Sequence, residues 1–227
     1  MQKYNVCIIL PALNEEVTIG KVIDEIPKLA LEQEGYQVEV VVVNNNSSDR
    51  TSQIAQEHGA RVINELARGK GRAVRTALES IKADFVFMLD ADYTYPATYI
   101  PEMLKILQQD YPVVIGSRLR GQCEKGAISR LNIVGNLLLT LMANILYQTR
   151  ISDLCTGYWG IRGEIIPKLK LRSDGFQLEA ELFAQVAKRR YRLAEVPIYY
   201  RRRQTKAKLN QIIDGIKIGW TLISRRF

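Results

Sequence analysis

The sequence predicts an α/β fold built on a mainly parallel sheet that is covered by helices on both faces. Short apolar segments of strand length alternate with segments of helical periodicity along the first half of the chain. A polar cluster follows each of four strand segments, at the end where such sheets bind ligands. The 227 residues, of which 47% are hydrophobic, suit one domain with a short extension.

The strands of this sheet are expected where β-branched or aromatic residues form short runs bounded by polar residues. Such runs occupy residues 5–10, 38–43, 61–63, 84–89 and 112–116. Helical periodicity between them predicts helices near residues 16–30, 49–58, 71–82 and 99–108. This spacing is typical of parallel strands joined by helical crossovers.

The second half of the chain is more helical. Residues 131–147 are apolar enough to resemble a membrane span, but polar side chains recur every four residues along one helical face. These are Asn132, Asn136, Thr140 and Asn144. Because a span needs about 20 continuous apolar residues, we predict an amphipathic or buried helix here.

We expect a main domain over residues 1–205 and an amphipathic C-terminal helix over residues 206–227. The apolar positions of that helix recur at helical spacing: Leu209, Ile212, Ile213, Ile216, Trp220, Ile223 and Phe227. Asp214, Lys217, Thr221 and Arg225 occupy its other side. Two interpretations remain open, a helix packed on the core and an interfacial helix lying on lipid.

The basic charge is concentrated in one segment. Residues 188–208 hold nine basic side chains and one acid, which accounts for the net charge of +8. A solvated face, an anionic membrane and a phosphorylated substrate all fit this pattern. No nucleic-acid partner is predicted, because no recognised binding module is present. Cys7, Cys123 and Cys155 lack metal-ligand spacing, and no signal peptide precedes the first strand, so we expect reduced thiols and a cytoplasmic location.

Two motifs carry the chemistry most directly. Asp90 and Asp92 flank Ala91 directly after an apolar strand, and two carboxylates so placed can share Mg²⁺ or Mn²⁺ with a diphosphate. Gly69, Lys70 and Gly71 precede a helix, where glycines and a lysine admit phosphate. Read alone, the second motif is equally compatible with a simple capped turn.

Taken together, the ordered motifs resemble those of family-two glycosyltransferases, which have the GT-A fold. They are Pro11–Glu15, Asn44–Thr51, Arg68–Gly71, Asp90–Asp92 and Gly116–Arg118. Within the family, the sequence is most similar to dolichyl- and polyprenyl-phosphate sugar synthases. That likeness depends on Ser129–Arg130, Val196–Ile198, Arg202 and Lys208–Leu209.

The resemblance implies an inverting transfer of a hexosyl group from GDP-mannose or a UDP-sugar to dolichyl or polyprenyl phosphate. It assigns the nucleotide-sugar to Pro11, Ala12, Asn14, Glu15, Asn45, Asp49, Lys70, Asp90 and Ala91. It assigns the metal to Asp90, Asp92 and Thr94, and the acceptor phosphate to Arg118, Arg130, Arg202 and Lys208. Catalysis would rest on Asp90, Asp92, Arg118 and Asp153.

Three positions depart from the family pattern. Asn44 and Asn45 stand where two aspartates are usual, so the identity of the base stays open, because an amide also donates hydrogen bonds. Thr94 replaces a glutamine that serves as a metal ligand, and Ala207 replaces the serine of an S-K-L motif. A catalytically weak nucleotide-sugar-binding protein of the same fold is therefore one alternative.

A phosphate acceptor suits the residues available. A phosphate monoester is largely dianionic at neutral pH and needs no general base, only cations. The single histidine, His58, is predicted to be structural. Asp153 would act as a base if the acceptor were an alcohol, and otherwise orders an acceptor loop. A soluble, glycan or protein acceptor remains a second alternative, whereas the glycine-rich opening of a sugar-phosphate nucleotidyltransferase is absent.

Many members of the family carry C-terminal membrane spans, and the sequence to Phe227 shows none. We therefore expect peripheral attachment to the cytoplasmic face of the membrane through the tail and the basic segment. A membrane-protein partner or a second copy of the chain is the other expectation.

Overall fold

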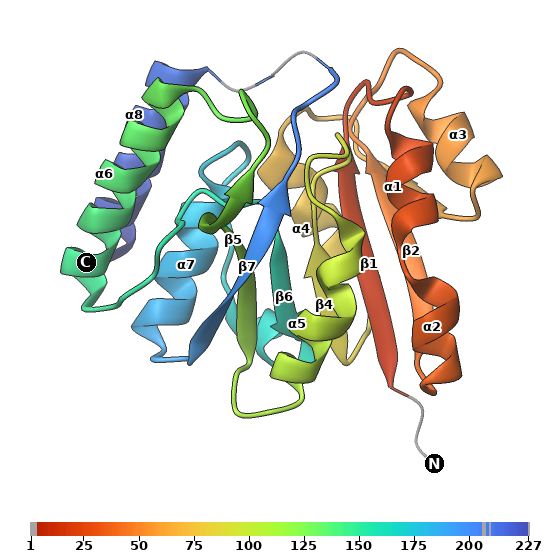
Figure 1. Ribbon diagram of the computed structural model, residues 1–227, viewed down its shortest axis with the longest axis horizontal. Coiled ribbons are helices and arrows are strands. Elements are labelled where there is room, and N and C mark those ends of the chain that lie inside the picture. The colour runs from red at the N-terminus through yellow and green to blue at the C-terminus, as the bar shows by residue number, and fades with distance from the viewer. Residues whose placement is uncertain (1–3, 206–207, 209, 227) are drawn as a thin grey trace.

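The computed structural model describes residues 4–205, 208 and 210–226. Its centre is a seven-stranded sheet in the order β3-β2-β1-β4-β6-β5-β7 (Figure 1). The strands are β1 (Asn5–Ala12), β2 (Gln37–Asn44), β3 (Arg61–Asn64), β4 (Phe85–Met88), β5 (Val113–Cys123), β6 (Trp159–Arg162) and β7 (Leu193–Tyr200). All pairs are parallel except the two made by β6. The predicted mainly parallel sheet is confirmed.

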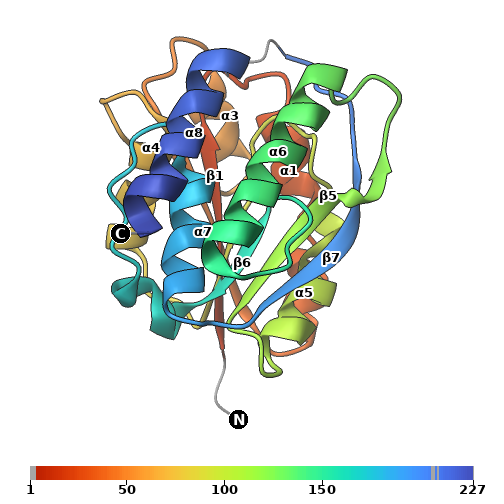
Figure 2. The same ribbon diagram turned by 90° about the vertical axis from the view of Figure 1, so that its left-hand side faces the viewer.

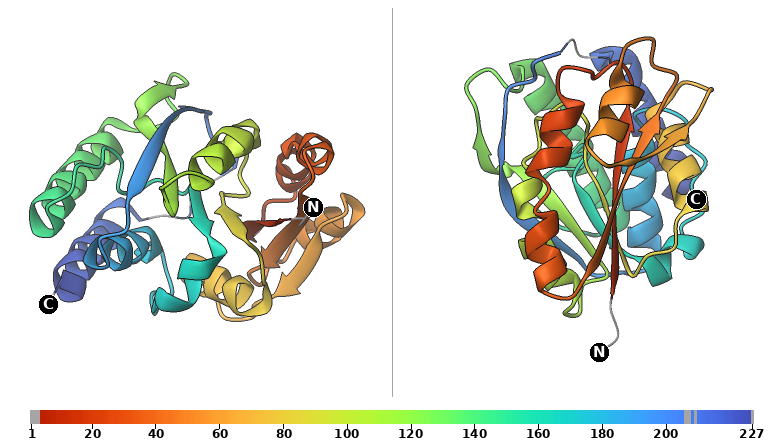
Figure 3. Two further views of the ribbon diagram at one scale, coloured as in Figure 1. Left: turned by 90° about the horizontal axis from the view of Figure 1, so that it is seen from below. Right: turned by 90° about the vertical axis from the view of Figure 1, so that its right-hand side faces the viewer.

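Helices cover both faces of this sheet, as Figure 3 shows from below and from one side. They are α1 (Ile19–Glu25), α2 (Lys28–Gln33), α3 (Thr51–Glu57), α4 (Lys70–Ser80), α5 (Ile100–Leu107), α6 (Arg130–Tyr147), α7 (Leu178–Lys188) and α8 (Gln211–Arg226). Two 3₁₀ helices, η1 (Ala97–Tyr99) and η2 (Gly163–Lys168), complete the set.

Successive side chains along β1 point alternately into two layers of the core. Val6, Ile8 and Leu10 belong to a buried cluster with residues of α1, α2, α3 and α5, whereas Cys7 and Ile9 pack with residues of α4. This is the period of two that a strand covered on both sides requires. A third cluster around Trp159 joins α6, α7 and α8 to β5 and β6.

The predicted elements need three corrections. The helix expected near residues 16–30 is divided into α1 and α2, with Pro27 at the break, because proline lacks the N–H that a continuous helix requires. The strand expected at 112–116 continues as β5 to Cys123. Finally, β6, β7 and α7 were not among the predicted elements. Strand β6 has only four residues, and it contains a glycine, which is rare in strands.

Helices α6 and α8 lie side by side at one end of the molecule, outside α7 (Figure 2). The polar row of α6 points inward, and Asn136 and Thr140 are buried. Its outer face is apolar, with Leu131, Val134, Leu137, Leu138, Leu141 and Ile145 exposed. Within the part of the chain described, α6 is the one helix long and apolar enough to cross a membrane. The amphipathic helix is thus confirmed, with its polar side toward the protein.

Helix α8 packs on both α6 and α7. Its own side chains Ile218 and Leu222 are buried, the Tyr147 hydroxyl donates to the Leu222 carbonyl at 2.8 Å, and Arg225 pairs with buried Glu181 at 2.5 Å. Its outer face exposes Ile212, Ile213, Ile216, Trp220 and Ile223. Leu209 and Phe227 of the predicted helix, and residues 206 and 207 at the predicted boundary, lie outside the described residues, so that boundary stays a prediction.

Candidate active site

The polar clusters at the carboxyl ends of the strands meet around one pocket, here called the carboxylate pocket. Its lining residues are Pro11, Ala12, Leu13, Glu15, Asn45, Gly69, Lys70, Ala73, Asp90, Ala91, Asp92, Phe176, Arg203 and Lys208. Most of the residues predicted to bind the nucleotide-sugar are therefore brought together. They come from four separate segments because parallel strands deliver their carboxyl ends to one edge.

Lys70 lies at the base of this pocket between two carboxylates. Its Nζ atom is 2.5 Å from Asp90 Oδ1 and 2.6 Å from Glu179 Oε1. Burial alone would lower the pKa of Lys70, but the two carboxylates raise it, so the ammonium stays charged. A side chain at position 157 would not fit beside this pair, since a Cβ added to Gly157 would lie 2.7 Å from Asp90 Oδ2.

Asp92 is buried and fully engaged. Its Oδ1 accepts from the Thr94 hydroxyl at 2.6 Å and the Thr94 amide at 3.1 Å, while Oδ2 pairs with Arg203 at 2.8 Å. Burial and the nearby charge of Asp90 raise the pKa of Asp92. Thr94, predicted as a metal ligand, thus orients the carboxylate of Asp92 in this structure.

Glu15 contacts three residues of the basic segment at the edge of the pocket. Its Oε1 lies 2.5 Å from both Arg203 and Lys208, and its Oε2 accepts from the Thr205 hydroxyl at 2.9 Å. Lys208, assigned by resemblance to the acceptor phosphate, therefore lies on the carboxylate side and lines the carboxylate pocket.

The two predicted asparagines shape the loops of the pocket. Asn45 donates to the carbonyls of Glu65 and Ala67 and accepts from the amide of Gly69 at 2.7 Å, so its amide holds the loop before Lys70. Asn14, at a positive φ of 49°, accepts from the amide of Ser48. The contact of the Asn45 oxygen does not exclude a ligand, because a carbonyl oxygen has two lone pairs.

Asp49 begins the connection into α3 and does not line the carboxylate pocket. It accepts hydrogen bonds from the amides of Glu16 and Thr51 and from the Thr51 hydroxyl. Although partial burial would raise its pKa, these hydrogen bonds lower it. His58 lies elsewhere, 2.7 Å from Asp24 with its ring against Gly20, as a structural residue would.

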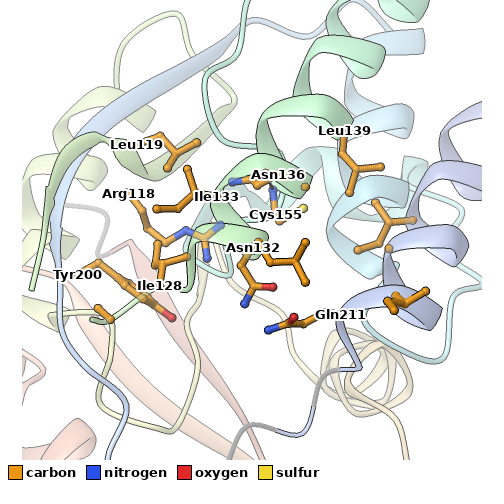
Figure 4. A pocket seen from close by; sticks show the side chains of 16 residues that line it. Arg118, Leu119, Ile128, Asn132, Ile133, Asn136, Leu139, Cys155, Tyr200 and Gln211 are labelled. Carbon is orange, nitrogen blue, oxygen red and sulfur yellow. Dashed lines mark hydrogen bonds between the residues drawn. The ribbon is translucent and has the colours of Figure 1, made fainter. Parts of the chain in front are cut away.

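A second pocket, the helix groove, lies between β5, α6 and α8 (Figure 4). Its walls are mostly apolar, and Arg118 and Tyr200 lie at its inner end. The labelled side chains in Figure 4 include Leu119, Ile128, Ile133 and Leu139. The groove therefore offers a hydrocarbon surface that leads to one buried cation.

Arg118 is held rigidly. Its Nε and Nη2 atoms donate to Asp153 at 2.8 and 2.7 Å, and its amide donates to the same carboxylate at 2.9 Å. Asn136 of α6 donates a further hydrogen bond to Asp153 at 2.6 Å. Burial alone would raise the pKa of Asp153, but the guanidinium of Arg118 lowers it, so Asp153 is a poor base and a good anchor.

A connecting cavity joins the two pockets. It shares Lys70, Asp90, Asp92 and Arg203 with the carboxylate pocket, and it shares Arg118 with the helix groove. Glu179 also lines it. A molecule in this cavity would touch both predicted halves of the site at once.

The remaining predicted acceptor cations are placed less centrally. Arg130 is the first residue of α6 and is exposed, and Arg202 is exposed with its amide bonded to Glu124. Neither lines the three pockets described above. Arg203 lines two of them, the carboxylate pocket and the connecting cavity. It was predicted only as one basic residue of segment 188–208, and Glu179 was not singled out.

Asp90 and Asp92 are suited to a divalent cation. Both are carboxylates on one pocket wall, and Mg²⁺ commonly takes only one or two protein carboxylates beside phosphate oxygens and water. The described residues contain no cluster of three or more His, Cys, Asp or Glu side chains that could hold a metal alone. A metal here would thus depend on ligands from a bound diphosphate.

A sheet of this order with two carboxylates beyond β4 is the arrangement of a GT-A glycosyltransferase. Residues 7–169 match the glycosyl transferase family 2, and the chain belongs to that family. It is 36% identical to glycosyltransferase AglJ of Haloferax volcanii, covering 94% of this chain and 68% of that protein. It is 34% identical to a dolichyl-phosphate hexose transferase of the same organism, covering 96% and 92%.

The GT-A fold is also confirmed by a solved structure. Glucosyl-3-phosphoglycerate synthase from Mycobacterium tuberculosis, in complex with Mn²⁺, UDP-glucose and phosphoglyceric acid, superposes with a TM-score of 0.77. The match covers 98% of this chain and 80% of that one at 23% identity. This likeness shows the shared architecture, and the family shows that the chain is a glycosyltransferase.

Proposed function

We propose that this glycosyltransferase moves a hexosyl group from a nucleotide-sugar to a dolichyl or polyprenyl phosphate, with inversion at the anomeric carbon. The observation that carries the proposal is the connecting cavity, which leads from the carboxylate pocket to Arg118 at the inner end of an apolar groove. A polar donor and a lipid-linked phosphate would meet there. The relatives that act on dolichyl phosphate, by name, support the same acceptor class.

On the donor side, Asp90 and Asp92 would hold Mg²⁺ or Mn²⁺. The bound ion would neutralise charge on the departing nucleoside diphosphate. Mn²⁺ accompanies UDP-glucose in the structure of glucosyl-3-phosphoglycerate synthase. Lys70, which stays positively charged, lies beside Asp90 and would also neutralise charge on the diphosphate. Its ion pair with Glu179 holds it there.

On the acceptor side, the phosphate would be received by the free edge of the Arg118 guanidinium, since Asp153 engages its Nε and Nη2 atoms. No general base is needed for a dianion. The geometry of Asp153 suits a positioning residue, because three of its contacts hold Arg118 and a fourth holds α6. Acceptor and leaving group would occupy opposite ends of the connecting cavity, which supports a single displacement.

We further propose that the outer face of α6 and α8 rests on the cytoplasmic surface of a membrane. Both helices turn their apolar sides outward, next to the mouth of the helix groove. Trp220, 68% exposed, is the kind of aromatic that interfacial helices place at the headgroup level. Arg130, Lys217 and Arg226 supply positive charge on the same two helices for anionic lipids.

Replacing Ile216 and Trp220 together by glutamine is expected to lower binding to anionic vesicles by at least about tenfold. Each side chain contributes roughly 1.5–3 kcal/mol when it leaves water. Sedimentation with phosphatidylglycerol vesicles measures the effect, and Ser224→Gln, also exposed on α8, is the matched control. Unchanged sedimentation of the double variant would make this face merely structural.

The proposed reaction is tested by a donor screen. Purified protein, Mg²⁺ or Mn²⁺ and a short polyprenyl phosphate are incubated with a panel of GDP- and UDP-sugars, and mass spectrometry detects the lipid-linked sugar. A product with one donor is expected, and it identifies the base and the sugar together. Nucleotide binding without product from any donor would favour a soluble or glycan acceptor, or a binding protein of the same fold.

A further inference from the structure

One cation of the carboxylate pocket occupies the place that a metal would need. The Nη1 atom of Arg203 lies 2.8 Å from Asp92 Oδ2, and its Nη2 atom lies 2.5 Å from Glu15 Oε1. Both carboxylates are almost fully buried, with side chains 4% and 5% exposed. A buried carboxylate requires a counter-charge, and Arg203 provides it here.

The contact involves the only oxygen of Asp92 that a ligand could use. Oδ1 is already occupied by the amide and hydroxyl of Thr94, which leaves Oδ2 for either Arg203 or a divalent cation. A divalent cation on that oxygen would carry twice the charge of the Lys208 ammonium that shares Glu15 Oε1 with Arg203, so it would repel the guanidinium more strongly. Arg203 and a metal therefore compete for Asp92.

Arg203 can also leave Glu15 without leaving that carboxylate unpaired. Glu15 keeps the ammonium of Lys208 at 2.5 Å and the hydroxyl of Thr205 at 2.9 Å, so it stays compensated when Arg203 moves. Only Asp92 is left in need of a positive charge. Arg203 also lines the connecting cavity, where a nucleoside diphosphate would offer it new acceptors.

We propose that Arg203 is the resident counter-cation of Asp92 and is exchanged for the divalent cation when a nucleoside diphosphate binds. The empty protein then binds the metal weakly, because the metal must first displace Arg203. The diphosphate removes this obstacle by drawing the guanidinium to its own oxygens while it supplies further metal ligands. This inference rests on the proposed function, since it takes the diphosphate of the donor as the exchanging ligand.

The test is the binding of Mn²⁺ to the purified protein, followed by the electron paramagnetic resonance signal of the free ion. Arg203→Met is expected to bind Mn²⁺ at least about tenfold more tightly than the unchanged protein when no nucleotide is present. Arg202→Met, which removes the same charge one residue away without touching Asp92, is expected to leave the affinity within about twofold. Lys208→Met should not raise the affinity, because Lys208 pairs with Glu15 and not with Asp92, and its loss makes Arg203 harder to release from Glu15.

The nucleotide gives a second, independent measurement. UDP or GDP should raise the Mn²⁺ affinity of the unchanged protein, and should raise that of Arg203→Met by a smaller factor, because the obstacle is already gone. Thermal melting of each variant shows that it is folded. Arg203→Lys, a smaller perturbation, should bind Mn²⁺ with intermediate affinity.

Equal Mn²⁺ affinities for the unchanged protein and a folded Arg203→Met, with and without nucleotide, would overturn the proposal while leaving the transferase reaction in place. A tenfold rise in Arg202→Met as well would also overturn it, because the effect would then be one of overall charge. Absence of Mn²⁺ binding in every variant, even with nucleotide, would refute the metal assignment of the proposed function together with this inference.

Discussion

Asp92→Asn is expected to lower turnover by about a thousandfold or more, while the protein stays folded. Asparagine keeps the shape of the side chain, so the hydrogen bonds from Thr94 to Oδ1 survive. It removes the charge that would hold the divalent cation, and with it several kcal/mol of stabilisation of the leaving diphosphate. Each 1.36 kcal/mol is about a factor of ten in rate.

The matched control is Asp84→Asn, which changes an aspartate that caps the Asn5 amide at the start of β1. Its turnover should lie within about twofold of the unchanged enzyme, because surface changes away from a site alter little. Transfer assays with and without EDTA complete the test. Full activity of Asp92→Asn in EDTA would remove the metal from this account.

Arg118→Ala is expected to lower transfer to lipid phosphate by at least about a hundredfold while nucleotide-sugar binding persists. The guanidinium lines the helix groove and the connecting cavity but not the carboxylate pocket, so its loss should be felt by the acceptor alone. Mutations that remove charged hydrogen bonds in such sites commonly cost a few kcal/mol. Initial rates measured against each substrate separately show which KM moves.

Arg118→Ala also lowers the stability of the fold, so a second variant is needed as a control. Asp153 has no exposed surface, and breaking a buried pair by removing one partner costs about 3–5 kcal/mol. Arg118→Ala combined with Asp153→Asn removes both charges and should recover much of the stability but none of the transfer. If donor binding falls as far as transfer in a folded variant, Arg118 belongs to the donor side.

The grouping of side chains at the carboxyl ends of the strands could be predicted, because the loops that follow parallel strands meet at one edge of the sheet. Glu15, Asn45, Lys70 and Asp90 come from four segments distant in sequence, and all line the carboxylate pocket. Their apolar strands and polar ends were plain in the sequence. No long-range contact had to be known in advance.

The choice between adjacent arginines could not be predicted in this way. Arg202 and Arg203 follow β7 in a segment without regular structure, so no period says which side chain faces the pocket. The choice is made by the buried carboxylates of Glu15 and Asp92, which pair with Arg203. Only the fold brings those carboxylates to this place.

The sequence also carried signals for Glu179 and for the polar face of α6, but these were harder to interpret. Glu179 and Glu181 lie between Leu178 and Leu182 on a buried helix, and charges in such a setting usually have a partner. The polar row of α6 was recognised, but its inward direction depends on Asp153, which Asn136 contacts. The outward apolar face follows from that contact.

In the proposed reaction, the acceptor is a phosphate carried on a lipid. A matched pair of acceptors tests it most directly: one short polyprenyl phosphate and the polyprenol of the same length, each with the donor identified by the screen. Sugar is expected to pass to the phosphate at least about a hundredfold faster than to the alcohol, because Arg118 would receive a dianion that needs no general base, whereas a hydroxyl needs one. Equal transfer to both, or transfer to the alcohol alone, would contradict the account.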